Sequence, residues 1–131
     1  MRQRELSRRA ARRTAVFLVY QWDVTGQPLA SLYEGEVDPF ARELAEAVAA
    51  QADELDARLS AASEGWPADR LGALERNVLR IGIFELDRGQ VPVEVAIDEA
   101  VELSKEYCGA DAPGFVNGVL GAALSERGAA G

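Results

Sequence analysis

The chain has 131 residues, of which 48% are hydrophobic, so it is long enough for one domain with a buried core and too short for two large ones. It has no histidine and a single cysteine, Cys108, which excludes histidine-based acid–base catalysis, histidine or thiolate metal clusters and an internal disulfide. The net charge is −8, yet residues 1–13 hold six arginines against one glutamate, which leaves +5 at the start and −13 over the rest.

The arginine-rich start does not resemble a targeting or membrane segment. It lacks the long apolar region and small-residue cleavage site of a secretory signal. No apolar run in the chain approaches the roughly 20 residues that cross a bilayer. A transit peptide is a weaker alternative, because the arginines share a helix with expected core residues. A lone cysteine suits a reducing compartment, so we expect a cytoplasmic protein without membrane association.

Apolar residues at helical spacing predict the first elements of the chain. One helix is expected over residues 7–24, followed by a short helical turn over residues 29–33. The next helix is expected over residues 38–62. Its start is marked by Asp38, which can cap it, and by Pro39 at the first helical position.

The most hydrophobic stretch, Leu71–Gly89, predicts a central helix around which the others pack. Its apolar residues between Val78 and Leu86 fall on almost every face of a helix, which is typical of a buried one. Gly89 can adopt the left-handed conformation that ends a helix. A buried strand is the competing interpretation, but the run is too long for one.

Two more helices complete the predicted fold. One spans residues 93–107, and the last spans residues 111–125 with Asp111 as its cap, followed by a frayed end. Five long helices and one short one, without a convincing strand, predict an all-α compact helical bundle. The link at residues 65–67 is expected to divide it into two halves that share one core. We treat residues 1–131 as a single all-helical domain, with an arginine-rich N-terminus over 1–13 and a central helix over about 71–88.

Little in the chain supports an enzyme. It shows no nucleophile beside a base, no glycine loop that cradles phosphate and no cluster of metal ligands. Gly82, Gly118 and Gly121 lie inside predicted helices, where they favour close helix–helix contact over a ligand site. We therefore expect no catalysis, no cofactor and no metal.

Binding is better supported than catalysis. Arginine clusters bind phosphate through charge-assisted, often bidentate hydrogen bonds. The first helix carries four arginines at neighbouring positions, Arg8, Arg9, Arg12 and Arg13. Tyr20 follows on the same helix, and aromatic residues near arginines commonly stack on unpaired bases. A solubilising leader explains the charge equally well, so these residues alone leave both single-stranded RNA binding and a leader as interpretations.

Three segments are distinctive as a set. They are Arg8–Trp22 (RRAARRTAVFLVYQW), Leu74–Leu86 (LERNVLRIGIFEL) and Val91–Leu120, which contains the run Phe115–Leu120 (FVNGVL). Together they resemble the NusB family of bacterial transcription antitermination factors, in the right order and over nearly the whole chain. The resemblance implies an all-helical protein of two packed three-helix halves and a function without catalysis.

The resemblance also implies partners. Family members bind the single-stranded boxA segment of nascent ribosomal RNA together with NusE, a small-subunit ribosomal protein. The complex helps RNA polymerase resist termination in ribosomal RNA operons. By position, the resemblance implies RNA contacts at Arg8, Arg9, Arg12, Tyr20, Tyr107 and Phe115, to which the arginine cluster adds Arg13. It places Glu75 at a NusE-facing position and Asp111 where NusE and RNA surfaces meet.

Several alternatives stay open. Asp111 can act solely as a helix cap, and Phe115 can be ordinary core. Phe17 stands where relatives often have glutamine, which removes one hydrogen-bonding group from the first helix. The same helical domain also targets certain ribosomal RNA methyltransferases to RNA, although a complete chain that ended at Gly131 would leave no room for a methyl-donor domain. A protein-binding helical adaptor and a homodimer that buries the arginines are further alternatives.

Overall fold

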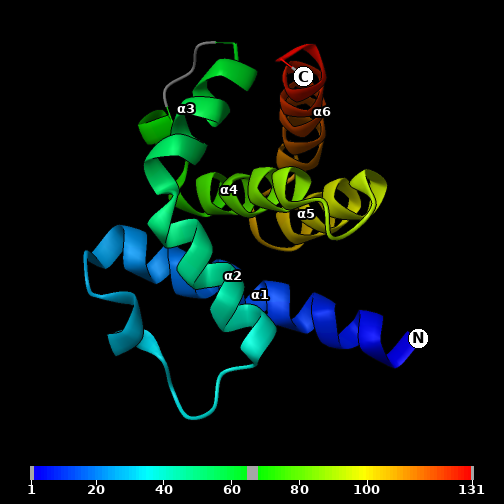
Figure 1. Cartoon of the computed structure of the whole chain (residues 1–131). Coiled ribbons are helices and arrows are strands. Elements are labelled where there is room, and N and C mark those ends of the chain that lie inside the picture. The colour runs from blue at the N-terminus through cyan, green and yellow to red at the C-terminus, as the bar shows by residue number, and fades with distance from the viewer. Residues whose placement is uncertain (1, 65–67, 131) are drawn as a thin grey trace. The chain divides into compact units, whose positions relative to one another are not determined.

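The computed structural model describes the backbone of residues 2–64 and 68–130, and these residues contain helices but no strand. Two short 3₁₀ turns separate some of the α-helices (Figure 1). The described elements are α1 (Arg2–Thr25), η1 (Leu29–Leu32), α2 (Pro39–Ala50), α3 (Ala52–Ala62), η2 (Ala68–Arg70), α4 (Ala73–Arg88), α5 (Val93–Tyr107) and α6 (Ala112–Ala130). The all-α prediction is confirmed. Among the described helices, none combines the length and the apolar character needed to cross a membrane.

Several helix ends fall where local chemistry predicts them. The carboxylate of Asp38 accepts hydrogen bonds from the backbone amides at the start of α2, and Pro39 is the first residue of that helix. Gly89 ends α4 with a φ of 68°, in the left-handed region that favours glycine. The predicted helix over residues 93–107 matches α5, and the predicted turn after residue 28 is η1.

Both terminal helices are longer than expected. α1 begins at Arg2, not at residue 7, and α6 continues to Ala130, where a frayed end was expected after residue 125. Residues 2–6 and 126–130 consist mainly of Arg, Gln, Glu, Leu and Ala, which have high helix propensity. Gly128 is the one poor helix former in these segments, and α6 continues through it.

The single helix expected over residues 38–62 is in fact two helices. Gln51 separates α2 from α3, with φ −109° and ψ 15°, and its backbone N–H donates to the carbonyls of Ala47 and Val48. The helices then bury their apolar faces against different neighbours, since α2 packs on α1 whereas α3 packs on α4 and α6. The expected link at residues 65–67 lies outside the described residues.

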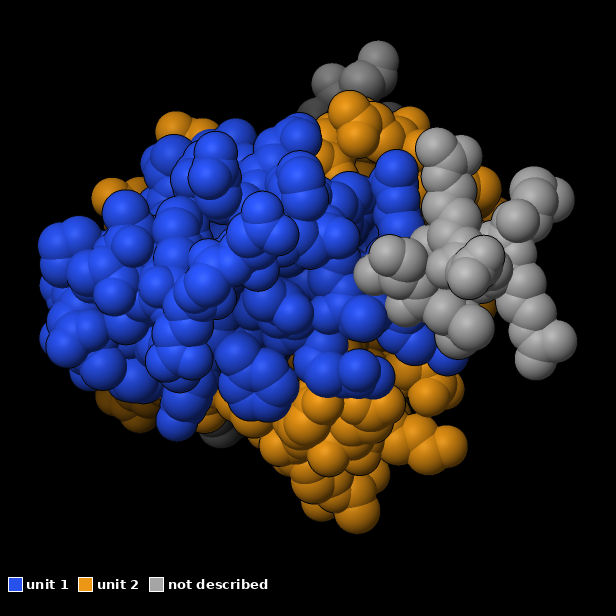
Figure 2. All heavy atoms as spheres, turned by 90° about the horizontal axis from the view of Figure 1, so that it is seen from below, with its two compact units in different colours: residues 1–51 blue, residues 52–131 orange. Residues whose placement is uncertain are grey.

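The chain divides into two compact units, residues 1–51 and 52–131, which Figure 2 shows in two colours. The boundary therefore lies at Gln51 and not at the link where the sequence placed it. In unit 1, α2 crosses α1 (Figure 1), and η1 also contacts α1. The core of unit 1 consists of aliphatic residues from both helices, with Ala15, Val16, Val19, Leu44 and Val48 fully buried.

The central-helix prediction is confirmed for unit 2, where α4 contacts α3, α5 and α6. All ten residues from Asn77 to Leu86 are buried, as expected of a helix surrounded by others. Gly82 allows α6 to approach closely, because a Cβ there would lie 3.0 Å from both methyl groups of Leu120. The same expectation is wrong for Gly118 and Gly121, where a Cβ would meet nothing within 4 Å.

α4 also carries a charge into the core of unit 2. Arg80 is only 5% exposed. Its Nε and Nη2 donate to the two carboxylate oxygens of Asp56 on α3, at 2.7 and 2.6 Å. Its Nη1 donates to Oδ1 of Asn77 at 2.9 Å. Because a buried charge is tolerated only when it is paired and hydrogen-bonded, this arrangement fixes α3 against α4.

Candidate functional site

The four arginines expected to form one basic surface lie on two neighbouring rows of α1. Arg9 is exposed, Arg8 and Arg13 are half-buried, and Arg12 is only 4% exposed. Arg8 and Arg12 are four residues apart and share one face of the helix, and both guanidinium groups lie over the ring of Phe40 on α2. Arg12 therefore differs from the expectation, since it is packed inside the fold instead of presented to a ligand.

Tyr20 lies further along α1 than the arginines. It follows Arg9 by 11 residues, which corresponds to roughly 17 Å along the helix axis. Tyr20 is half-buried beside the fully buried Val19. α1 thus presents arginines in its first half and a partly accessible aromatic ring near its end. An extended single strand of nucleic acid lying along the helix could contact both.

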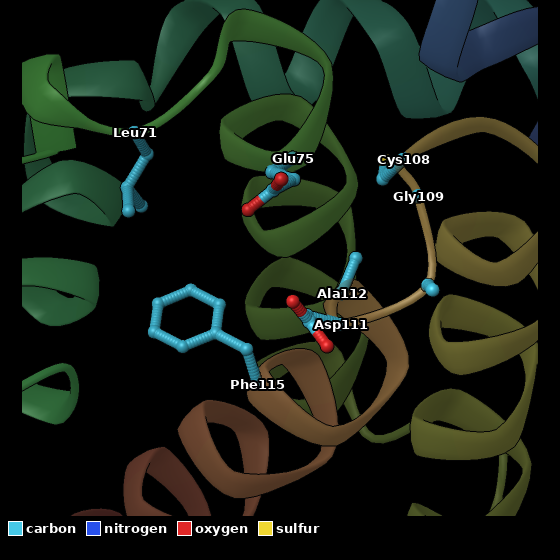
Figure 3. Close-up of a pocket in the computed structure, with 8 residues that line it drawn as sticks. Leu71, Glu75, Cys108, Gly109, Asp111, Ala112 and Phe115 are labelled. Atoms are coloured by element: carbon cyan, nitrogen blue, oxygen red, sulfur yellow. The ribbon is translucent and has the colours of Figure 1, made fainter.

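A pocket of about 620 Å³ in unit 2 brings together three of the predicted site residues, Glu75, Asp111 and Phe115. Their side chains border the same open space in Figure 3, from α4, from the loop before α6 and from the first turn of α6. We call this the Glu75 pocket. Its lining residues are Leu71, Glu75, Cys108, Gly109, Ala110, Asp111, Ala112 and Phe115.

The loop between α5 and α6 is shaped by local chemistry. The N–H of Cys108 donates to the carbonyl of Ser104 at 2.8 Å, which ends α5. Gly109 follows with a φ of 96°, where a side chain would be strained, so the chain can reverse direction. Asp111 then lies directly before α6, and its backbone carbonyl accepts a hydrogen bond from the N–H of Phe115 at 3.5 Å.

The charged groups of the Glu75 pocket are carboxylates, those of Glu75 and Asp111. Burial raises the pKa of the Cys108 thiol to about 11, with a further contribution from the negative charge of Glu75. The thiol is therefore neutral at pH 7 and a poor nucleophile. With Leu71 and Phe115 as apolar walls, the pocket suits a cationic group on an apolar stem.

Metal binding has no comparable support. Within the described part of the chain, no group of three His, Cys, Asp or Glu side chains is placed to hold a metal ion.

Tyr107 is half-buried at the end of α5, directly before the loop but outside the pocket lining. The arginines and Tyr20 belong to unit 1, so the structure presents two candidate surfaces, one in each unit. Sequence reasoning missed Phe40 and Leu71. Both looked like ordinary apolar residues, and their positions beside Arg8 and Glu75 depend on how the helices pack.

Comparisons with known proteins match nearly the whole chain. The model of the NusB family matches residues 9–125. A transcription antitermination protein NusB of Rubrobacter xylanophilus is 45% identical over 122 residues, which cover 88% of each chain. The NusB protein of Solibacter usitatus is 36% identical, over 92% of this chain and 90% of that protein.

Solved structures give the same result. A crystal structure of the antitermination factors NusB and NusE in complex with double-stranded RNA matches 91% of this chain and 96% of that chain, with a TM-score of 0.79 and 28% identity. NusB of T. maritima matches with a TM-score of 0.80 and 29% identity, over 91% of each chain. The similarity thus extends over both units of the fold.

Proposed function

Because this chain belongs to the NusB family, we propose that it is a cytoplasmic transcription antitermination factor that binds single-stranded boxA RNA of ribosomal RNA operons together with NusE. The complex helps RNA polymerase resist termination. One observation carries the proposal: Glu75, Asp111 and Phe115 are separated by up to 40 residues in the chain, yet they line one pocket.

The RNA-binding part of the proposal rests on α1. The body of the chain is acidic and repels phosphate, so affinity for RNA must be concentrated where the arginines lie. Arg8, Arg9 and Arg13 are accessible enough to contact phosphates. Arg12 is buried, so its role is to pack α1 against α2. Tyr20 on α1, with Tyr107 and Phe115 beside the α5–α6 loop, supplies rings on which unpaired bases can stack.

The partner-binding part rests on the Glu75 pocket. Two carboxylates beside apolar walls disfavour a phosphate and favour a lysine or arginine side chain from a protein. We therefore assign Glu75 to the NusE surface. Asp111 lies at the edge of that surface next to Phe115, where both partners can be contacted.

The test is an electrophoretic mobility shift with labelled boxA RNA, with and without NusE. We expect the chain alone to shift boxA RNA in preference to a scrambled RNA of the same length and composition. Adding NusE is expected to lower the protein concentration needed for half-maximal binding. A shift that NusE does not change would point to RNA binding without the proposed partnership, and no shift with either RNA would favour a protein-binding adaptor.

Replacing Glu75 with lysine should weaken binding to NusE at least tenfold. The substitution places a cation in a pocket proposed to receive one, and like charges across an interface are strongly unfavourable. Isothermal titration of NusE into the variant measures the effect. RNA binding by the variant alone should be retained, because α1 is unchanged.

The matched control is Glu102→Lys. Glu102 is exposed on α5 and lies outside the pocket lining, and its replacement changes the net charge by the same amount. Equal loss of NusE affinity in both variants would mean that overall charge matters and that the pocket does not.

A further inference from the structure

Phe40 contacts two of the arginines through the face of its ring. The Cζ atom of Arg8 lies 4.4 Å from the ring centroid, and that of Arg12 lies 5.5 Å from it. Both distances are within the range in which a guanidinium group is attracted to an aromatic face. All three residues belong to unit 1, on the packed pair of helices α1 and α2.

The backbone of Phe40 is fixed by the N-terminal cap of α2. Phe40 is the second residue of α2, and its backbone N–H donates to Oδ1 of Asp38 at 2.8 Å. Pro39 precedes it with a fixed φ, which limits the backbone further. The following residue, Ala41, is fully buried. Phe40 is thus anchored by the cap of α2 before either arginine contacts it.

The two arginines use the ring differently. Arg12 is 4% exposed, so its contact with Phe40 belongs to the packing of α1 against α2. Arg8 lies one turn earlier, closer to the ring centroid, and remains partly accessible. A guanidinium group that rests on a ring still has N–H groups around its edge that can donate to a phosphate.

We propose that Phe40 is a positioning residue of the RNA-binding surface: its ring holds the guanidinium group of Arg8 in place for phosphate. This inference rests on the proposed function, because it assumes that α1 binds RNA. An arginine side chain loses considerable rotamer freedom when it is fixed in a complex. Where the ring has already restricted that freedom, less is lost on binding and the affinity is higher.

A purely structural role for Phe40 makes a different prediction. If the ring only stabilises the packing of α2 on α1, its loss should affect every arginine of α1 alike. If it positions Arg8, its loss should matter only while Arg8 is present. Arg9 separates the two cases, because it is exposed and lies about 100° around the helix from Arg8.

The experiment is a double-mutant cycle measured by fluorescence anisotropy with labelled boxA RNA. Phe40→Leu keeps an apolar side chain but removes the aromatic face, and we expect it to weaken RNA binding about three- to fivefold. The same substitution should have little effect in the Arg8→Ala background and its full effect in the Arg9→Ala background. Phe40→Tyr, which keeps the ring, should restore affinity.

The outcomes separate this inference from the proposed function. Failure of the unmodified chain to bind boxA RNA would overturn both. RNA binding that weakens in Arg9→Ala but not in Phe40→Leu would overturn only the positioning role, as would an equal effect of Phe40→Leu in the two arginine backgrounds. Should Phe40→Leu fail to fold, NMR relaxation of the arginine Nε–H groups in the unmodified chain decides. We expect a higher order parameter for Arg8 than for the exposed Arg70, and equal mobility would contradict the proposal.

Discussion

Replacing Asp56 with alanine is expected to lower the free energy of unfolding by about 3 kcal/mol. Asp56 provides both carboxylate oxygens that pair with the Nε and Nη2 groups of Arg80. The side chain of Arg80 is only 6% exposed, so its charge stays in a poorly solvated site after the substitution. Because the side chain of Asp56 is 27% exposed, water can solvate part of the unpaired Arg80 charge after the substitution. The expected loss is therefore at the lower end of the range for breaking a buried ion pair. Urea denaturation followed by far-UV circular dichroism measures the change.

Two variants give this prediction its controls. Arg42→Ala breaks the ion pair with Glu46, whose side chains are 60% and 55% exposed, and should cost less than about 0.5 kcal/mol. A double variant, Asp56→Leu with Arg80→Leu, removes both charges and should recover most of the loss. A loss of stability in Asp56→Ala no larger than in Arg42→Ala would show that the buried pair is not needed.

Replacing both Arg9 and Arg13 with alanine is expected to weaken boxA RNA binding roughly 10- to 100-fold at moderate salt. Each arginine is proposed to make a charge-assisted hydrogen bond to a phosphate, and neither is as buried as Arg12. Fewer counterions are then released on binding. The slope of log affinity against log salt concentration should become shallower by roughly 1.4, which is the value for two phosphate contacts on a single strand. Anisotropy titrations over a range of salt concentrations measure both quantities.

The comparison variant is Arg42→Ala with Arg70→Ala. Both residues are exposed, and the change in net charge is the same. We expect this variant to bind RNA almost as tightly as the unmodified chain, with nearly the same salt dependence. If the two double variants lose RNA affinity equally, the affinity depends on the total charge of the protein and α1 has no specific RNA-binding surface.

The helices were predictable where a local signal marks them. Asp38 and Pro39 start α2, and Gly89 ends α4, for reasons contained in a few neighbouring residues. The break at Gln51 had no such signal, because glutamine is a good helix former and the apolar pattern continues through it. It arises from packing, since α2 and α3 belong to different units.

The candidate sites show the same limit. The sequence indicated that four arginines cluster on the first helix, but it could not show that Phe40 covers Arg8 and Arg12. The burial of Arg12 follows from a partner 28 residues away in the chain. Family resemblance pointed to Glu75 and Asp111 separately. Their common pocket depends on the packing of α4 with α5 and α6, which no short segment determines.

The single thiol of the chain has a consequence for the protein under oxidative stress. Cys108 lines the Glu75 pocket, and its pKa, raised to about 11, keeps the thiol protonated at pH 7. Peroxide and electrophiles attack the thiolate, so the side chain reacts slowly even though it is partly accessible. Burial, with a smaller contribution from the negative charge of Glu75, thus keeps the thiol of this pocket in its less reactive protonated form.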